Sequence, residues 1–310
     1  MAPQPRASGG NAEVFAIGDV ARATGLSTHT IRVWERRYGK PVPERLPSGQ
    51  RRYSMEQVRW LRLVAEALAL GHRPSKAVPA AEAQLTAMLE SRTEESEDPQ
   101  TVAALFQRVR DFDAEAVNAI LRQSWEQLGP QSFLKQLIAP LVVAVGRAWA
   151  EGALQVRHEH FVSELLEDFL RGRRQEIELA DDAPVMLFAG LEPEHHSLGL
   201  QMAGLIAVLC GVRSRILGIG TPLIEIVGAA REEGVFAVGI SVSLATGGVE
   251  TDRELAALRT ALPDEIALVI GGAGARGVRR GTRGVDYLAS LGQLEDWLRA
   301  AARGTRGSSR

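Results

Sequence analysis

An acid and a histidine two positions apart, Glu194 and His196, have the types and spacing needed to present a metal ligand. They follow a continuous apolar run at residues 184–190, which is typical of a strand buried on both faces. An imidazole at the carboxyl end of a strand can bind a metal, or the metal of a cofactor. A nearby carboxylate can accept the other ring N–H, which fixes the tautomer and raises ligand basicity. Gly199, three positions later, leaves room for a ligand or a second backbone.

Later apolar runs lead into a pair of hydroxyls and a pair of glycines: Ser241, Ser243, Gly271 and Gly272. A hydroxyl and a backbone without side chains suit an inserted, bulky nucleotide tail. The runs lie at residues 184–190, 212–218, 235–242, 266–270 and near 285–288, with helical segments at 197–209, 222–233, 250–261 and 291–302. This alternation predicts a flavodoxin- or Rossmann-like, doubly wound parallel sheet. Right-handed crossovers place all strand carboxyl ends on one edge, where such sheets bind ligands.

A helical region at residues 99–178, which is expected to form a four-helix bundle, precedes the predicted sheet. Trp149 ends one amphipathic segment, and the pair Glu159-His160 opens the next. A short connection would bring these residues to one end of a bundle, where an aromatic ring, an acid and an imidazole can cover a flat ligand. A tryptophan at a helix end is more often core, and a glutamate at a helix start often serves the helix dipole. These three residues therefore indicate a ligand site only in combination with the predicted sheet that follows them.

The N-terminal region carries a strong local charge that the whole-chain net charge of −2 conceals. Residues 11–79 hold twelve Lys and Arg against six Asp and Glu, whereas residues 80–98 hold six acids and one arginine. A basic region of this size favours a polyanionic partner. Residues 15–27 predict a short helix, a turn at Gly25 and a new N-cap at Ser27. A second helix at 28–38 and a basic turn or hairpin at 45–53 complete a winged helix-turn-helix.

Residues 31–39 and 49–54 resemble the DNA-binding head of the MerR family, in which the second helix reads the major groove. The resemblance implies that Arg32 and Arg36 contact bases or phosphates and that Arg51 and Tyr53 of the wing contact the DNA backbone. Arg37 and Tyr38, at the end of the same helix, complete the set of expected DNA contacts. Trp34 is expected in the core, because helical spacing places it near Ile31 and Tyr38.

The body resembles the cobalamin-binding fold shared by methionine synthase, mutases and corrinoid proteins. Its pattern is Asp or Glu-x-His-x-x-Gly, then Ser-x-Leu, then Gly-Gly, and this chain matches the first and third elements. The middle element departs, since Ser243 stands where leucine is usual, so the hydroxyl is either Ser241 or Ser243. The resemblance implies that His196 is the lower cobalt ligand and that the displaced nucleotide tail enters the sheet edge.

The order of the three regions, from residue 13 to about 303, resembles the CarH/LitR group of photoreceptor repressors. This implies adenosylcobalamin, or another cobalamin form, between bundle and sheet, with Trp149, Glu159 and His160 over its adenosyl side and Val156 beside them. In the dark the holo-protein would form dimers and a tetramer on operator DNA. Light would break the Co–C bond, and the oligomer and its DNA complex would come apart.

One position departs from that group, in which a histidine follows the tryptophan and binds cobalt after illumination. Here the position is Ala150, which cannot ligate a metal. We therefore expect a water-ligated light product, or capture by another histidine such as His160.

Three other functions stay open at this stage. They are a cobalamin-level sensor without a light response, a corrinoid carrier for methyl transfer, and a MerR-type regulator whose body binds a partner protein without a cofactor. The DNA-binding head argues against the carrier, and the intact Glu194, His196 and Gly271-Gly272 argue against loss of the cofactor. No catalytic constellation is recognised, so we expect a protein that is not an enzyme.

Composition supports a globular protein, with 45% hydrophobic and 24% charged residues. One cysteine, Cys210, excludes a disulfide scaffold and a thiolate zinc site, favours a reducing cytoplasmic setting, and is expected to be inert core. No secretory signal and no run of about 18 apolar residues is found, so no membrane association is expected. His158 and His195 are expected at the surface. The expected divisions are a DNA-binding domain at 13–79, an acidic linker at 80–98, a helical cap at 99–180, a cobalamin-binding domain at 183–303 and a disordered tail at 304–310.

Overall fold

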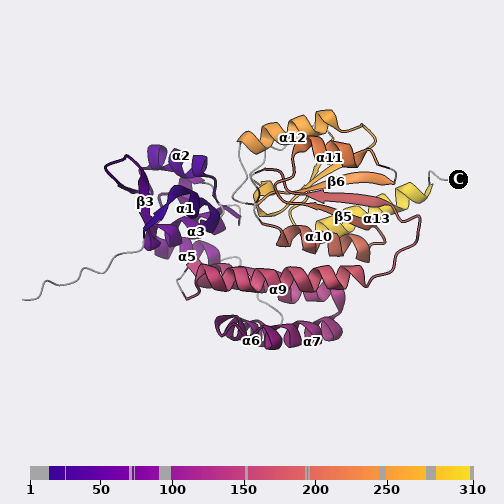
Figure 1. The fold of residues 1–310 in the computed structure, drawn as a ribbon, viewed down its shortest axis with the longest axis horizontal. Helices are drawn as coiled ribbons and strands as arrows, with labels where there is room; N and C mark the ends of the chain where they lie inside the picture. Colours follow the sequence, from indigo (N-terminus) through magenta and orange to yellow (C-terminus); the bar gives the residue numbers. More distant parts are fainter. Residues whose placement is uncertain are drawn as a thin grey trace, which may run out of the picture.

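The computed structural model describes residues 14–24, 26–69, 72, 74–90, 99–150, 153–192, 194, 196–232, 234–243, 249–276 and 284–307. A basic head, a helical cap and an α/β body follow one another along the chain (Figure 1). One hydrophobic core runs from the head through the cap to one face of the main sheet, and a second core covers the other face.

The head is a winged helix-turn-helix, as the sequence predicted. Its elements are β1 (Val14–Ala16), α1 (Ile17–Thr24), α2 (Thr28–Tyr38), β2 (Glu44–Arg45), β3 (Arg51–Ser54), α3 (Met55–Ala69) and α4 (Pro74–Ala77). The three strands form an antiparallel sheet in the order β1-β3-β2. The side chain of Ser27 caps α2 by accepting from the Thr30 N–H, and Gly39 ends the helix in the left-handed conformation, φ 66°.

A further helix, α5 (Glu82–Glu90), occupies the first half of the stretch that was expected to be an acidic linker. Its Leu85 is fully buried, and the helix packs against α3. The expectation of a solvated segment was wrong here, because the apolar Leu85 and Met88, three positions apart, give the helix a face that the net acidic charge conceals. Residues 91–98 lie outside the described part of the chain.

The cap consists of α6 (Pro99–Arg110), α7 (Ala114–Ser132), a π-helix at Phe133–Ile138, α8 (Ala139–Ala150) and α9 (Val156–Gln175). The π-helix buries Phe133, Leu134, Leu137 and Ile138 completely. One stretch of the described residues, Ala114–Gly146, matches a membrane span in length and apolar composition. A non-helical Gly129 (φ 72°) interrupts that stretch, and a third of its most apolar window is buried inside the protein.

The body is a five-stranded parallel sheet, which confirms the predicted fold class. Its strands are β4 (Val185–Ala189), β5 (Arg213–Gly218), β6 (Val235–Ser241), β7 (Ala267–Gly271) and β8 (Val285–Tyr287), in the spatial order β5-β4-β6-β7-β8. All four neighbouring pairs are parallel. Helices α11 (Leu223–Ala230) and α12 (Val249–Ala261) cover one face, and α10 (Leu198–Leu209) and α13 (Leu291–Gly307) cover the other (Figure 1).

Helix α13 continues through Gly307, although a disordered tail was expected from residue 304. Within the helix, Leu294 and Leu298 are buried, and Glu295 pairs with Arg299 one turn later at 2.9 Å. Glu295 also accepts bonds from Gln131 (2.9 Å) and Lys135 (3.2 Å) of the cap, so α13 fastens the body to the cap.

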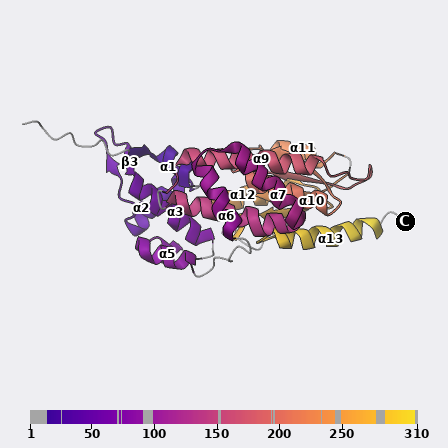
Figure 2. The same ribbon diagram turned by 90° about the horizontal axis from the view of Figure 1, so that it is seen from below.

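The head contacts both other regions through α3. This helix packs against α8 of the cap and against the short 3₁₀-helix η2 (Ala273–Arg276), which follows β7. Strand β7 ends at Gly271, so η2 lies at the carboxyl edge of the sheet. The head therefore lies beside the edge on which the site residues were expected (Figures 1 and 2).

Candidate functional site

The Glu194–His196 pair lies just beyond the carboxyl end of β4. The side chain of Glu194 is 1% exposed, and its Oε1 accepts from the His196 backbone N–H (2.9 Å) and from the ring Nδ1 (3.0 Å). Because an ionised carboxylate only accepts, Nδ1 carries the proton, and in the neutral ring Nε2 then presents its lone pair. The His196 side chain is 46% exposed, and no described residue forms a hydrogen bond at Nε2. An oriented imidazole with a free, basic nitrogen is suited to bind a metal from outside the chain.

Strand β6 and the residues after it contribute to the same site as Glu194 and His196. The Ser243 backbone N–H, just after β6, donates to Oε2 of Glu194 at 2.8 Å. The hydroxyl of Ser241, the last residue of β6, lies 3.3 Å from the point where a side chain on Gly199 would begin. The two serines left open by the sequence are thus distinguished: Ser241 faces Gly199, and Ser243 holds Glu194 through its backbone.

The glycines near this edge leave different kinds of space. A Cβ on Gly271 would meet only the Leu288 carbonyl, at 4.0 Å, so Gly271 leaves open room that a ligand could use, whereas a Cβ on Gly199 would press on the Ser241 hydroxyl. By contrast, a Cβ on Gly272 would lie 2.5 Å from the Val242 carbonyl, and one on Gly274 would lie 2.0 Å from the Ser243 carbonyl. These two glycines let the loops after β6 and β7 pack together, a role that the sequence reasoning missed. A place for Gly272 in a ligand site stays a prediction.

The cap is joined to this edge by polar contacts along α9 and α10. Ser197, next to His196, donates to Glu167 at 2.5 Å, and Arg174 donates to Gln201 at 3.0 Å. Burial lowers the pKa of the Arg174 guanidinium. His160 lies seven residues before Glu167, so both project from the same face of α9, about 10 Å apart along its axis. His160 is 73% exposed, and its Nε2 lies 3.5 Å from Glu159.

The other cap residues singled out by the sequence are only partly described. Trp149 lies in the last turn of α8, and Val156 is the first residue of α9, but their side chains lie outside the described part of the chain, as does all of His195. The connection between α8 and α9 is short, as expected. His158 was expected at the surface, which is wrong: it is buried, it stacks on Phe112 with centroids 4.5 Å apart, and its Nδ1 accepts from the Gln155 N–H.

In the head, α2 presents a basic face. Ile31 and Trp34 are buried in the core, as predicted for Trp34, while Arg32, Arg36 and Arg37 are exposed. The Arg37 guanidinium lies 5.4 Å from the ring centroid of Tyr38. A short helix with exposed cations and a buried opposite face has the form of a major-groove recognition helix.

The wing is fastened to α2 by Glu35, a residue that the sequence reasoning missed. Its carboxylate accepts from the Arg51 Nε (2.8 Å) and from the Tyr53 hydroxyl (2.5 Å). Tyr53 is fully buried, and its burial, followed by the bond to Glu35, raises the pKa of its hydroxyl. The bond to Glu35 likewise raises the pKa of Arg51. Both residues therefore set the position of the wing, and their expected DNA contacts stay predictions. A glutamate placed between the recognition arginines Arg32 and Arg36 is the signal that could have shown this pairing.

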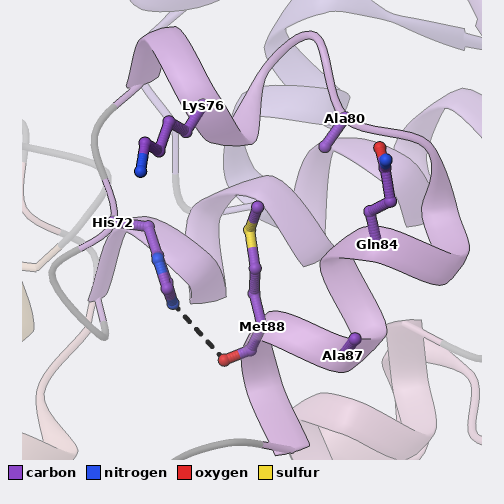
Figure 3. A pocket seen from close by; sticks show the side chains of 6 residues that line it. All are labelled: His72, Lys76, Ala80, Gln84, Ala87 and Met88. Atoms are coloured by element: carbon purple, nitrogen blue, oxygen red, sulfur yellow. Dashed lines mark hydrogen bonds between the residues drawn. The ribbon is translucent and has the colours of Figure 1, made fainter.

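An open groove of about 530 Å³ lies elsewhere in the head, between the end of α3, α4 and α5 (Figure 3). It is lined by His72, Lys76, Ala80, Gln84, Ala87 and Met88. Its single polar contact between the residues drawn joins His72 Nε2 to the Met88 carbonyl at 3.4 Å. No metal-binding cluster of three or more His, Cys, Asp or Glu occurs among the described residues. No acidic side chain is among the residues that line the groove, so it has no counterpart of the Glu194–His196 pair.

Comparisons with known proteins agree with this arrangement. The MerR HTH family regulatory protein pattern matches residues 15–82, and the B12 binding domain pattern matches residues 101–171. The chain is 29% identical over 301 residues to the HTH-type transcriptional repressor CarH of Myxococcus xanthus, covering 93% of this chain and 98% of that protein. It is also 29% identical over 262 residues to the repressor CarA of the same organism, covering 84% and 87%.

The fold has a counterpart among solved structures. The monomethylamine corrinoid protein of Methanosarcina barkeri superposes with a TM-score of 0.51 at 13% identity, over 66% of this chain and 99% of that one. At this identity the likeness concerns the fold alone. The chain thus resembles MerR-type repressors in its order of regions, and its cap and sheet have the fold of a corrinoid protein.

Proposed function

We propose that this protein is a cobalamin-binding transcriptional repressor in the cytoplasm, that adenosylcobalamin is its light-absorbing cofactor, and that it acts by binding operator DNA rather than by catalytic turnover. The observation that carries the proposal is the Glu194–His196 pair, with its free Nε2 at the sheet edge, in the same chain as a basic winged helix-turn-helix. Similarity to two repressors over most of the chain supports the regulatory role.

The residues at the edge fit a corrinoid. His196 Nε2 would bind the cobalt, Glu194 would hold the opposite nitrogen protonated, and the open room at Gly271 would receive the nucleotide tail, beside Ser241 and the bare α-carbon of Gly199. When bound, an alkylcobalamin supplies a cobalt–carbon bond that light can break. His160, on the face of α9 that binds the body, would lie on the upper side with Glu159, Trp149 and Val156.

The chain offers a route from that site to the DNA. Glu167 of the cap binds Ser197, which is adjacent to His196, so a movement of α9 acts directly on the loop that holds the ligand. Helix α8 of the same cap contacts α3 of the head. A change in the spacing between cap and sheet would therefore change the position of the DNA-binding head relative to both. In an assembly of several copies it would also change the spacing of the heads along an operator. We propose that the dark holo-protein is a dimer or tetramer that light takes apart.

The test starts from purified protein mixed with adenosylcobalamin in darkness. Absorbance, size-exclusion chromatography and binding to a selected DNA library are measured before and after illumination. We expect a retained alkylcobalamin spectrum, a larger species in the dark, and loss of size and of DNA affinity in light. His196→Ala should change the axial-ligand spectrum, whereas the same change at the buried His158 serves as the matched control for loss of an imidazole. Dark binding without a light-driven change in size or DNA affinity would refute the photoreceptor.

A second function, sensing of cobalamin level without a light response, is favoured by one observation. Ala150 places no imidazole after Trp149, so the adduct expected after photolysis cannot form through this position. His160→Ala tests whether His160 supplies the missing imidazole. If His160 binds the cobalt after illumination, the unaltered protein gives a bis-imidazole spectrum and this variant does not. If the variant and the unaltered protein both give that spectrum, His160 is not the ligand.

A further inference from the structure

Ile219 is an exposed isoleucine next to the Glu194–His196 pair. It directly follows β5, at the carboxyl edge of the sheet, and is 37% exposed. Large apolar side chains at the rim of a polar site are often in contact with ligand, because exposing them to water is unfavourable.

Gly190 brings Ile219 and Glu194 together. A Cβ on Gly190 would lie 2.9 Å from Cγ of Glu194 and 3.4 Å from Cγ2 of Ile219, so both side chains pack against its bare α-carbon. The Gly190 N–H donates to the Gly218 carbonyl (2.8 Å), and the Thr221 N–H donates to the Gly190 carbonyl (2.9 Å). These two backbone bonds fix the loop that carries Ile219 against the end of β4.

The conformation of that loop depends on glycine. Gly218 and Gly220, on either side of Ile219, have φ values of 107° and 61°, which other residues rarely adopt. The Thr221 hydroxyl also donates to the Gly218 carbonyl at 3.2 Å. The isoleucine is thus held in a tight turn that presents it at the edge of the sheet.

The sheet order places three neighbours side by side. In the order β5-β4-β6, the loops carry Ile219, Glu194 and Ser243 respectively. The Ser243 backbone N–H binds one oxygen of the Glu194 carboxylate, and Ile219 lies with the Glu194 side chain against the bare α-carbon of Gly190. The carboxylate between these two loops is almost fully buried, and exclusion of water strengthens its bonds to His196.

We propose that Ile219 is an apolar wall of the cofactor site, which contacts the hydrocarbon surface of a large planar macrocycle bound at His196 and positions Glu194 by excluding water from it. The inference rests on the proposed cobalamin binding and extends the site to the loop that follows β5. A corrin ring, with apolar faces and a methyl-bearing rim, has the matching chemistry. Ile219 acts on the metal ligand through Glu194 and is a positioning residue.

The test compares Ile219→Ser with Ile224→Ser in the full chain. Ile224 lies on α11, five residues later, and is 74% exposed, so it controls for loss of an exposed isoleucine. Affinity is measured by absorbance titration with adenosylcobalamin in darkness. We expect Ile219→Ser to weaken binding about tenfold, Ile219→Val to restore most of it, and Ile224→Ser to change it less than twofold.

A second readout separates positioning from general damage. The paramagnetic resonance spectrum of bound cob(II)alamin shows splitting from an axial nitrogen, and ¹⁵N-histidine labelling shows whether that nitrogen comes from the protein. Ile219→Ser should weaken the labelled splitting, while its circular dichroism spectrum stays that of the unaltered protein. If Ile219→Ser matches Ile224→Ser in cobalamin affinity and in the labelled histidine splitting, the proposed role of Ile219 is refuted, while the cobalamin-binding function stands. If the unaltered protein binds no cobalamin, both proposals fail.

Discussion

Replacing Glu35 by alanine should loosen the wing of the head by a predictable amount. The change removes the carboxylate that accepts the hydrogen bond of the Tyr53 hydroxyl, and Tyr53 is fully buried. A buried hydroxyl left without a hydrogen-bond partner costs about 1–3 kcal/mol. It also removes the ion pair with Arg51, whose side chain is 24% exposed, so solvent screening limits that loss to about 0.5–1 kcal/mol. We therefore expect the local free energy of opening to fall by about 1.5–4 kcal/mol in sum.

Hydrogen–deuterium exchange read by mass spectrometry suits this measurement, because the chain has several regions and need not unfold in two states. A loss of 2 kcal/mol corresponds to roughly 30-fold faster exchange for amides that exchange through opening of the wing. Peptides that cover α2 and β3 should show the effect, and peptides from the sheet of the body should not.

Two controls make the reasoning refutable. Glu44→Ala removes an exposed carboxylate from the neighbouring strand β2 and should change exchange little. In a double-mutant cycle, Tyr53→Phe should reduce the effect of Glu35→Ala by about 1–2 kcal/mol, since the hydroxyl that needs the acceptor is gone. If Glu35→Ala exchanges no faster than Glu44→Ala, the pairing does not hold the wing.

Four further outcomes follow from the described contacts. Because the pKa of Tyr53 is raised in the folded protein, its hydroxyl contributes its full stabilisation below pH 10, and this stabilisation is lost as the pH rises further. Tyr53→Phe should therefore remove the late step of a tyrosinate absorbance titration, the step that accompanies unfolding. Gly274→Ala should separate the loops after β6 and β7 and weaken cobalamin binding at least tenfold in an absorbance titration, whereas Gly228→Ala on α11, where an added Cβ meets nothing, should leave binding unchanged. Arg36→Ala should lower the slope of log affinity against log salt by about one in a DNA-binding titration, and an unchanged slope would remove it from the phosphate contacts. Burial raises the pKa of the Cys210 thiol, so a thiol-reactive dye at pH 8 should label it much more slowly than after denaturation.

Element types were predictable from the sequence because their patterns are strong. The apolar run that became β4 is buried at every position, and continuous runs separated by helices allow few arrangements other than a parallel sheet. The helix at 28–38 has its cap and its stop in the sequence, at Ser27 and Gly39. The placement of Glu194 beside His196 also followed from local spacing.

Contacts between distant segments were not predictable in the same way. The pairing of Glu35 with Tyr53 joins a helix to a strand 18 residues away, and the bond from Ser243 to Glu194 spans 49 residues. Gly272 and Gly274 show the same limit, because a missing side chain in the sequence does not say whether ligand or backbone fills the space. The burial of His158 depends on Phe112, which the corner between α6 and α7 brings to it.

The contact of α3 with both α8 and η2 has a thermodynamic consequence. Two binding events that bias the same packed unit are linked, and the coupling free energy is equal in both directions. If cofactor loading changes operator affinity by a given factor, operator DNA must change cofactor affinity by that same factor. Dark cobalamin affinity measured with and without bound DNA therefore gives the strength of the regulatory signal without any measurement of transcription.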